Sequence, residues 1–245
     1  MATQLLSGKS ALVTGGALRI GREIALAFAE AGADVAITYR TSRSEALETV
    51  REIEFFGGRA LALKCDVRSE RQVRKAVEAV VSQFGRLDVL VNNAAVFESV
   101  PLERMSLEQW DAVFETNARG PFLVAREALP HLRAVEGRIV NIGSLGGIQA
   151  WADHAHYCGS KAAVHMLTRA MAKAFAPEVS VNCVAPGRIE MDDHSEDEVA
   201  RFAAKTPMMR NGRAGDVAQA VLFFATGPRF ITGQILTVDG GLGLV

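Results

Sequence analysis

The amino-acid sequence predicts an α/β protein with one doubly wound parallel sheet of about seven strands and helices on both faces. Three observations support this fold class. Short apolar runs alternate with stretches in which apolar residues recur at helical spacing. The runs are apolar on both faces, which is typical of strands buried in a parallel sheet. No repeat or Pro/Gly-rich linker interrupts the 245 residues, so we expect a single domain over residues 1–245.

The predicted strands are spaced so that a helix fits after each of them, and such crossovers are right-handed. The apolar runs occupy residues 10–14, 35–39, 60–64, 87–91, 138–142, 179–184 and 234–238. Helical spacing is clearest in three sets: Ile20, Ile24, Ala27, Phe28 and Ala31; Val73, Ala76, Val77, Val80 and Phe84; and Met166, Leu167, Ala170, Met171 and Ala174. The polar stretch 192–198 is interpreted as a loop entering a helix and as a candidate lid.

Composition excludes several classes of partner. The 27 basic and 28 acidic residues give a net charge of −1, so no strong field attracts nucleic acid or an anionic membrane. Cys65, Cys158 and Cys183 are odd in number and far apart, which favours a reducing compartment. Residues 1–9 do not resemble a signal peptide, and no apolar run reaches the length of a membrane span. We therefore expect a cytoplasmic protein that binds neither nucleic acid nor a membrane.

A glycine-containing turn follows the first predicted strand. Residues 14–21 read Thr-Gly-Gly-Ala-Leu-Arg-Ile-Gly and lead directly into the first helix. Glycines let the backbone turn tightly and approach a pyrophosphate, and the N–H groups at the start of the helix attract its charge. A glycine pattern of this kind also occurs in ordinary strand-to-helix turns, so its context decides.

The end of the second predicted strand indicates which dinucleotide binds. A site for NAD places Asp or Glu there to bond the ribose 2′-hydroxyl, but no acid occurs before Glu45. Arg40, Ser42 and Arg19 instead offer the cations and hydroxyl that a 2′-phosphate requires. The sequence therefore favours NADP(H) as the cofactor, unless Arg40 and Arg43 are only solvated surface charges.

Tyr157 and Lys161 lie four residues apart at the start of a predicted helix and so project from one face. A lysine ammonium and an oxidised nicotinamide nearby both favour the tyrosine phenolate, which lowers its pKa. Ser144 follows the fifth strand, where its hydroxyl can hold a carbonyl oxygen beside the phenol. A Tyr-x-x-x-Lys pair also occurs by chance in many helices. Its assignment as a catalytic pair therefore depends on the other motifs in the sequence.

Together these motifs resemble the short-chain dehydrogenase/reductase family, whose fold is Rossmann-like, over nearly the whole chain. The resemblance rests on residues 14–21, Asn92-Asn93-Ala94-Ala95, Asn117, Ser144, Tyr157 with Lys161, Pro186-Gly187 and Val238-Asp239-Gly240-Gly241. It implies an NADP(H)-dependent oxidoreductase acting on CH–OH/C=O groups, which reduces a ketone such as a 3-oxoacyl or other small carbonyl substrate.

The resemblance also assigns roles to residues. It implies a catalytic tetrad of Asn117, Ser144, Tyr157 and Lys161, with Tyr157 as proton donor and Lys161 on the nicotinamide ribose. The sequence itself predicts no metal ligand. The cofactor contacts that sequence and resemblance suggest are Gly15, Arg19, Ile20, Gly21, Tyr39, Arg40, Ser42, Asp66, Val67, Asn93, Ala94, Ala95, Tyr157, Lys161, Pro186, Gly187 and Ile189. The resemblance further implies a homo-oligomer, a tetramer or dimer, built on the helices around residues 110–132 and 157–175.

Two departures from the family pattern leave the substrate open. Arg19 replaces the middle glycine of the first turn, and Met191 stands near the place of a threonine that often follows the Pro-Gly pair. Both changes resemble the pteridine-reductase branch, whereas Ser144 follows the ketoreductase pattern. A pteridine reductase-like enzyme is therefore the alternative.

Two further hypotheses concern a non-catalytic role and a metal site. A non-catalytic NADP(H)-binding sensor is the alternative of another class, but the intact Ser144, Tyr157 and Lys161 speak against it. A metal site at His154, His156 and Cys158 lacks a fourth ligand at suitable spacing. Phe97, Trp151 and Met191 are candidates for the substrate pocket, and Glu98, Asp192 and Asp193 for polar substrate contacts or hydrated loop charges.

Overall fold

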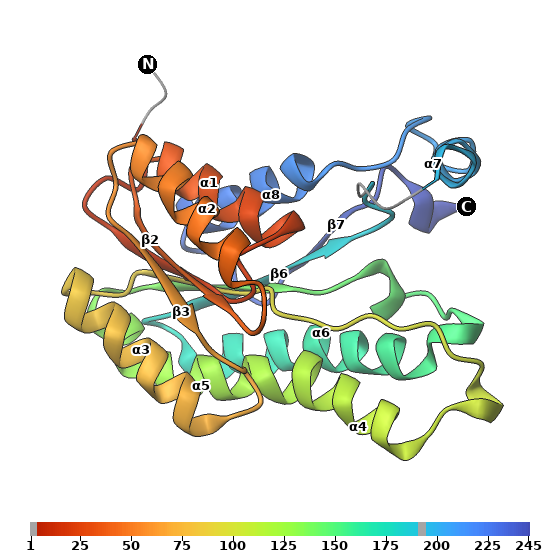
Figure 1. Ribbon diagram of the computed structural model, residues 1–245, viewed down its shortest axis with the longest axis horizontal. Coiled ribbons are helices and arrows are strands. Elements are labelled where there is room, and N and C mark those ends of the chain that lie inside the picture. The colour runs from red at the N-terminus through yellow and green to blue at the C-terminus, as the bar shows by residue number, and fades with distance from the viewer. Residues whose placement is uncertain (1–3, 191–194) are drawn as a thin grey trace.

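The computed structural model describes residues 4–190 and 195–245. It contains a seven-stranded sheet that lies between two layers of helices (Figure 1). The strand order is β3-β2-β1-β4-β5-β6-β7, and every pair of neighbours is parallel. The strands are β1 (Ser10–Val13), β2 (Asp34–Tyr39), β3 (Ala60–Lys64), β4 (Val89–Asn92), β5 (Arg138–Ile142), β6 (Ser180–Pro186) and β7 (Ile235–Val238). The predicted fold class is confirmed.

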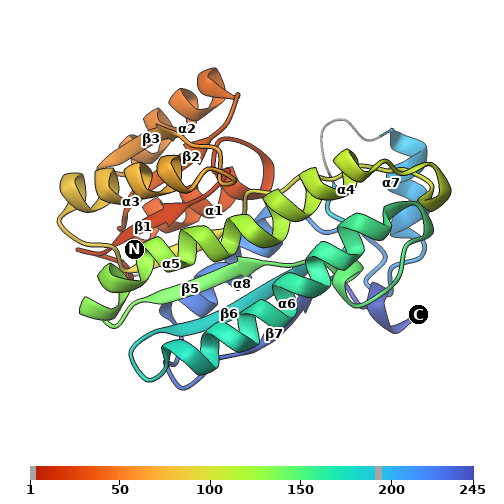
Figure 2. The same ribbon diagram turned by 90° about the horizontal axis from the view of Figure 1, so that it is seen from below.

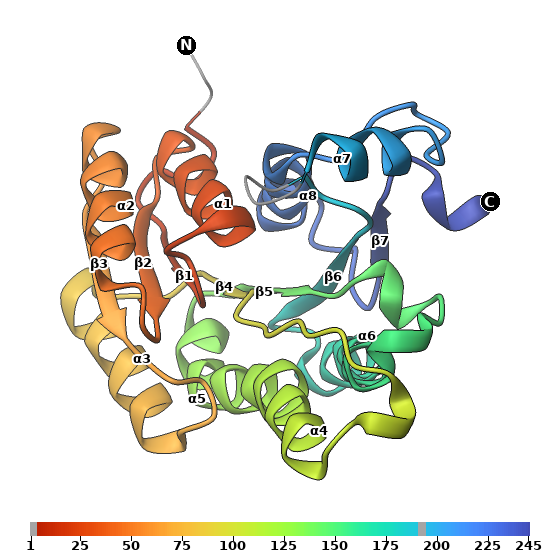
Figure 3. The same cartoon turned by 45° about the vertical axis from the view of Figure 1, so that its right-hand side comes forward.

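Helices cover both faces of the sheet (Figure 3). One face carries α1 (Arg19–Glu30), α2 (Arg43–Phe55) and α8 (Ala214–Thr226), and the other carries α3 (Glu70–Phe84), α5 (Gly120–Ala134) and α6 (Ala155–Phe175). The short helices α4 (Leu107–Phe114) and α7 (Glu196–Ala203) lie at the end of the molecule where the C-terminus also lies (Figure 2). In the described parts of the chain, no helix has the length and hydropathy that a membrane span requires.

The central strands are apolar on both sides because each side packs against a helix layer. Val13, Ile37 and Val91 belong to the core beneath α1 and α8. Their neighbours Leu12 and Leu90 point the opposite way, into the core beneath α3 and α5. All five are at most 1% exposed, and burying each contributes about 1.5–3 kcal/mol. This two-sided burial explains why the strands read as continuous apolar runs rather than alternating ones.

All seven predicted strands are present, although some of their ends differ. Residues 87 and 88 precede β4 instead of opening it. The Asp88 carboxylate accepts a hydrogen bond from the Ser10 N–H and pairs with Arg86, so this acid anchors the entry to the strand. At the other end, β6 continues to Pro186, which pairs with Val238 at the last position of the β6–β7 ladder.

Two other expectations from the sequence need correction or lie outside the described residues. The expectation that a helix follows every strand is wrong at β7, which leads only into the 3₁₀ turn Leu242–Leu244. In the predicted lid over residues 192–198, Ser195 caps α7 through a capping box with Glu198. Asp192, Asp193 and the neighbouring Met191 lie outside the described residues, so their roles and the lid stay predictions.

The strand order places a crevice at one edge of the sheet. From β1 the chain winds outward through β2 and β3, then crosses to β4 and winds the other way. The segments that leave β1 and β4 therefore diverge at their carboxyl ends. In open α/β sheets this switch point is where ligands bind.

Candidate active site

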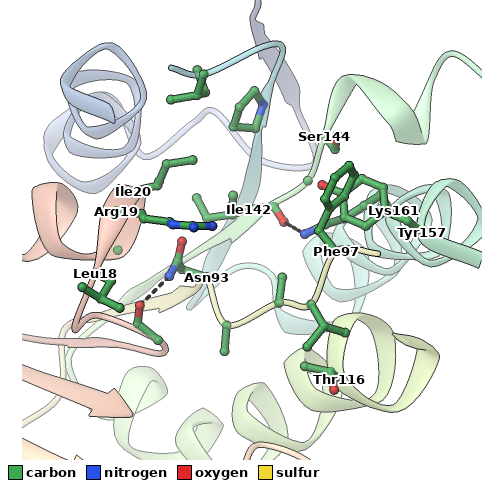
Figure 4. A pocket seen from close by; sticks show the side chains of 18 of the residues that line it. Leu18, Arg19, Ile20, Asn93, Phe97, Thr116, Ile142, Ser144, Tyr157 and Lys161 are labelled. Carbon is green, nitrogen blue, oxygen red and sulfur yellow. Dashed lines mark hydrogen bonds between the residues drawn. The ribbon is translucent and has the colours of Figure 1, made fainter. Parts of the chain in front are cut away.

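A cavity of about 1280 Å³ opens at the carboxyl ends of the strands (Figure 4). It exceeds the roughly 300–1,000 Å³ of pockets for drug-sized ligands, so a dinucleotide and a second small molecule fit together. All of the predicted cofactor contacts line it: Gly15, Arg19, Ile20, Gly21, Tyr39, Arg40, Ser42, Asp66, Val67, Asn93, Ala94, Ala95, Tyr157, Lys161, Pro186, Gly187 and Ile189.

The turn between β1 and α1 forms a cradle that only glycine permits. Gly15 has φ +63°, in the left-handed region, and a Cβ on Gly21 would lie 2.3 Å from the Gly15 carbonyl oxygen. The Asn93 amide donates to the carbonyls of Thr14 and Gly15 at 2.9 and 3.0 Å, which ties this turn to the segment after β4. The N-cap residue of α1 is Leu18, whose apolar side chain accepts no hydrogen bond from the helix. The first N–H groups of the helix therefore remain available to a phosphate.

Positive and hydroxyl groups follow β2. Arg40 and Ser42 line the cavity together, at the position where an acid would bind an unphosphorylated ribose. Asp66, after β3, is bound to Arg68 at 2.6 Å, and this hydrogen bond holds the pKa of its carboxyl below the usual value, with the charge of Arg40 adding to the effect. Arg19 has φ +52°, and its side chain extends into the cavity (Figure 4). The residues present therefore fit a nicotinamide dinucleotide.

Ser144, Tyr157 and Lys161 come together on one side of the cavity (Figure 4). Ser144 follows β5 and begins the 3₁₀ turn Leu145–Gly147, while the other two lie in the first two turns of α6. The Lys161 Nζ lies 5.7 Å from the centroid of the Tyr157 ring, and Ser144 lines the same side of the cavity (Figure 4). The structure thus brings together the three side chains that the sequence singles out.

Burial controls the ionisation of this group. It raises the pKa of Tyr157, and the hydrogen bond with Ser144 opposes the shift. Burial also lowers the pKa of Lys161 to about 8. The sequence suggests instead a lowered pKa for Tyr157, but among the protein's own groups desolvation of the phenol is the largest effect. Tyr157 is consequently protonated at neutral pH and can donate its proton.

Asn117 lies outside the cavity lining, in a π-helical turn, Glu115–Arg119, that joins α4 to α5. Its buried amide accepts a hydrogen bond from the Val96 N–H at 2.8 Å and donates to the Val96 carbonyl at 3.0 Å and to Ser160 at 3.1 Å. The side chain therefore joins the segment after β4 to α6. Its contacts fit a positioning role better than contact with substrate.

An aromatic wall surrounds the phenol of Tyr157. Phe97 packs edge-on against the Tyr157 ring with centroids 4.8 Å apart, and Trp151 stacks on it at 6.1 Å. His154 in turn stacks on Phe97 at 4.7 Å. All three line the cavity, and Phe97 is 59% exposed. The structure therefore places Phe97 and Trp151 in the cavity, as predicted for substrate-pocket residues.

The contacts of the histidines beside Tyr157 bear on the hypothesis of a metal site. Across residues 4–190 and 195–245, no group of three His, Cys, Asp or Glu side chains is arranged to hold a metal ion. His156 is fully buried, and its Nε2 lies 4.0 Å from a carboxylate oxygen of Glu98. Glu98 also accepts a hydrogen bond from Gln109 at 2.6 Å and does not line the cavity.

His165 lies near the candidate site but is not identified from the sequence. His165 is 6% exposed and lies one helical turn after Lys161, against the segment that carries Ser144. Its only sequence signal is the spacing from Lys161. A core residue on the buried face of a helix gives the same signal, so the pattern alone does not distinguish the two.

Comparisons with known proteins agree with this geometry. The family model described as enoyl-(acyl carrier protein) reductase matches residues 6–243. The chain is 40% identical over 240 residues to the 3-oxoacyl-[acyl-carrier-protein] reductase FabG of Staphylococcus aureus (strain Mu50 / ATCC 700699), covering 96% of this chain and 98% of that protein. The chain belongs to the short-chain dehydrogenase/reductase family.

Solved structures support the same assignment. A dehydrogenase/reductase from Sinorhizobium meliloti 1021 matches with a TM-score of 0.92 and 36% identity, covering 98% of this chain and 97% of that chain. A blue fluorescent protein from a metagenomic library, in complex with NADPH, matches with a TM-score of 0.90 and 36% identity, covering 97% and 98%. This short-chain dehydrogenase/reductase is accordingly an oxidoreductase acting on CH–OH/C=O groups with a nicotinamide cofactor. The hypothesis of a non-catalytic sensor is not retained.

Proposed function

We propose that this short-chain dehydrogenase/reductase reduces a ketone with NADPH and that Tyr157 donates the proton. The observation that carries the proposal is the convergence of Ser144, Tyr157 and Lys161 in the cavity that the glycine turn enters. A 3-oxoacyl thioester is the first substrate to test, because the relative from S. aureus is named for that reaction.

The choice of NADP(H) rests on charge at the end of β2. Arg40 and Ser42 bind the 2′-phosphate in this proposal, and Arg19 adds a second cation from the glycine turn. A carboxylate at the end of β2 would repel that phosphate, and Arg40 occupies the place where one would lie. The NADPH bound to one structural neighbour agrees with this choice.

In the proposed reaction a reduced nicotinamide supplies the hydride to the carbonyl carbon. The Tyr157 phenol donates its proton to the carbonyl oxygen, which yields the alcohol and a phenolate. The Ser144 hydroxyl donates a hydrogen bond to the same oxygen, which orients and polarises the carbonyl. Lys161 holds the ribose of the cofactor and, with Asn117 fixing α6 nearby, returns a proton to Tyr157 by way of water.

A pteridine reductase-like activity is the second candidate. It is favoured by Arg19 in the glycine turn and by the exposed ring of Phe97 beside Tyr157, since a flat heterocycle stacks well on an aromatic side chain. Ser144 speaks for the ketoreductase reaction. The homo-oligomer implied by the resemblance stays a prediction.

The test is a carbonyl screen with the purified protein, followed through the absorbance of NADPH. Acetoacetyl thioesters, small ketones and dihydrobiopterin are compared, each with NADPH and with NADH. We expect turnover of a ketone with NADPH and a kcat/KM at least about tenfold lower with NADH. Turnover of dihydrobiopterin alone would favour the second candidate. A preference for NADH would contradict the cofactor assignment.

A further inference from the structure

His165 is a buried imidazole that the proposed reaction does not use. It lies in α6, and its ring packs against residues 143–147, the segment that carries Ser144 from β5 into the following 3₁₀ turn. A buried polar side chain costs stability unless hydrogen bonds compensate for the lost water. The contacts of the ring therefore indicate why a histidine stands there.

Two glycines on either side of Ser144 make room for the ring. A Cβ on Gly143 would lie 2.3 Å from His165 Nε2, and a Cβ on Gly147 would lie 2.6 Å from His165 Cε1. Both distances are far below van der Waals contact. The backbone of residues 143–147 thus wraps closely around the imidazole, and any side chain at either glycine would displace the ring.

A hydrogen bond from the backbone indicates which neutral form the ring adopts. The Ser144 N–H donates to His165 Nε2 at 3.4 Å, so this nitrogen carries a lone pair. The proton of the neutral ring therefore lies on Nδ1, on the side of Gly147. Burial, together with the charges of Lys161 and Arg169, lowers the pKa of His165 to about 4. The ring is consequently neutral at physiological pH and accepts the Ser144 N–H.

The same segment determines where the Ser144 hydroxyl points. The Gly146 N–H donates to Ser144 Oγ at 3.0 Å, and the Gly147 N–H donates to the Ser144 carbonyl at 2.9 Å. His165 contacts this turn at its beginning and at its end. Moving the ring would therefore tilt the turn and move Ser144 Oγ relative to the Tyr157 phenol.

We propose that His165 is a positioning residue for Ser144: its neutral imidazole clamps residues 143–147 so that the Ser144 hydroxyl reaches the phenol of Tyr157. The proposal rests on the proposed function, in which Ser144 and Tyr157 act on the carbonyl oxygen. It adds that the α6 helix delivers three groups one turn apart, with Tyr157 and Lys161 acting directly and His165 acting through Ser144.

The test compares three replacements of His165 that differ in reach. In H165Q the amide oxygen reaches the place of Nε2 and accepts the Ser144 N–H, whereas the shorter side chain of H165N does not, and H165L offers no acceptor. We expect H165N and H165L to lower kcat at least about tenfold with little change in the KM for NADPH, and H165Q to recover most of the loss. The control is H131L, because His131 lies in the last turn of α5 and does not line the cavity.

A spectroscopic readout separates positioning from a general loss of structure. The chain has only two tyrosines, so the ultraviolet titration of Tyr157 in the cofactor-free protein follows by difference from Y157F. The charged and polar groups that act on this phenol are Ser144, Lys161 and Cys158. Because the hydrogen bond with Ser144 lowers the pKa of Tyr157, H165N must raise that pKa toward the value in S144A. A merely structural role would leave it unchanged.

A double-mutant cycle completes the test. If His165 acts through Ser144, H165N causes no further fall in kcat and no further rise in the pKa of Tyr157 when S144A is already present. Equal effects of H165N with and without Ser144 would overturn the proposal, as would full activity of H165N. If S144A itself retained full activity, the proposed function would fail instead. The comparison of H165N with H165Q keeps the test valid where H165L does not fold.

Discussion

The Nζ of Lys161 donates a hydrogen bond to the carbonyl oxygen of Ile142 at 2.8 Å. This bond joins the second turn of α6 to the last residue of β5. Since Ser144 follows β5 two residues later and Tyr157 lies one turn before Lys161, the bond holds the two halves of the candidate active site together. It also gives the buried ammonium a partner.

Reversal of charge at Arg40 tests the cofactor assignment. We expect R40E to raise the KM for NADPH about tenfold to a hundredfold, because it removes a charge-assisted bond to the 2′-phosphate and adds a repulsion. The KM for NADH should change little. The matched control is R43E, since Arg43 begins α2 three residues later but does not line the cavity. Equal KM values for NADPH in R40E and in the unaltered protein would contradict the assignment.

The raised pKa of Tyr157 predicts the pH dependence of the reaction. Burial keeps the phenol protonated beyond its ordinary pKa of about 10. The proton donor is therefore present throughout the neutral range, and ketone reduction declines only as the pH rises through the pKa of Tyr157. S144A shifts this decline to higher pH, because it removes the hydrogen bond that lowers the pKa. A rate that falls between about pH 6 and 7 would indicate an imidazole as the donor instead.

Burial of the Lys161 ammonium lowers the free energy of unfolding at neutral pH. Its pKa falls from 10.5 to about 8 on folding, so the folded protein binds fewer protons than the unfolded chain between these values. The destabilisation is complete below about pH 8 and disappears as the pH rises toward 10.5. K161M removes the buried charge, and we expect it to abolish turnover yet to raise the free energy of unfolding at pH 7 by on the order of 1–3 kcal/mol.

Denaturant unfolding of the cofactor-free protein measures this effect, with K173M as the control. Lys173 lies in the last turn of the same helix and is exposed. The gain in K161M should shrink as the pH approaches 10.5. A gain that stays constant with pH, or a loss of stability at pH 7, would show that the ammonium is not destabilised by burial.

Much of the fold could be predicted because the dominant interactions leave periodic patterns. The runs that became β1, β2, β4 and β5 are apolar on both faces, and only a parallel sheet covered by two helix layers buries both. Strand ends were less predictable. For example, Asp88 lies before β4 and not within it, and its carboxylate accepts a hydrogen bond from the Ser10 N–H. That contact joins residues far apart in the chain and leaves no local signal.

The candidate site divides in the same way. Gly15, Gly21, Tyr157 and Lys161 stand at spacings that the backbone geometry of a turn or helix imposes, so the sequence reveals them. The contact of His165 with residues 143–147 depends on how α6 packs beside β5, and only the structure shows it.

Replacement of Tyr157 by phenylalanine shows whether the phenol is the proton donor. Y157F removes one hydroxyl and keeps the ring that packs against Phe97 and Trp151, so NADPH binding, measured by its fluorescence, should change less than about threefold. Ketone reduction should fall by about a thousandfold or more, because a general acid contributes 10²–10⁴-fold and the oxygen loses its proton source. Turnover by Y157F within about tenfold of the unaltered protein would show that another group donates the proton.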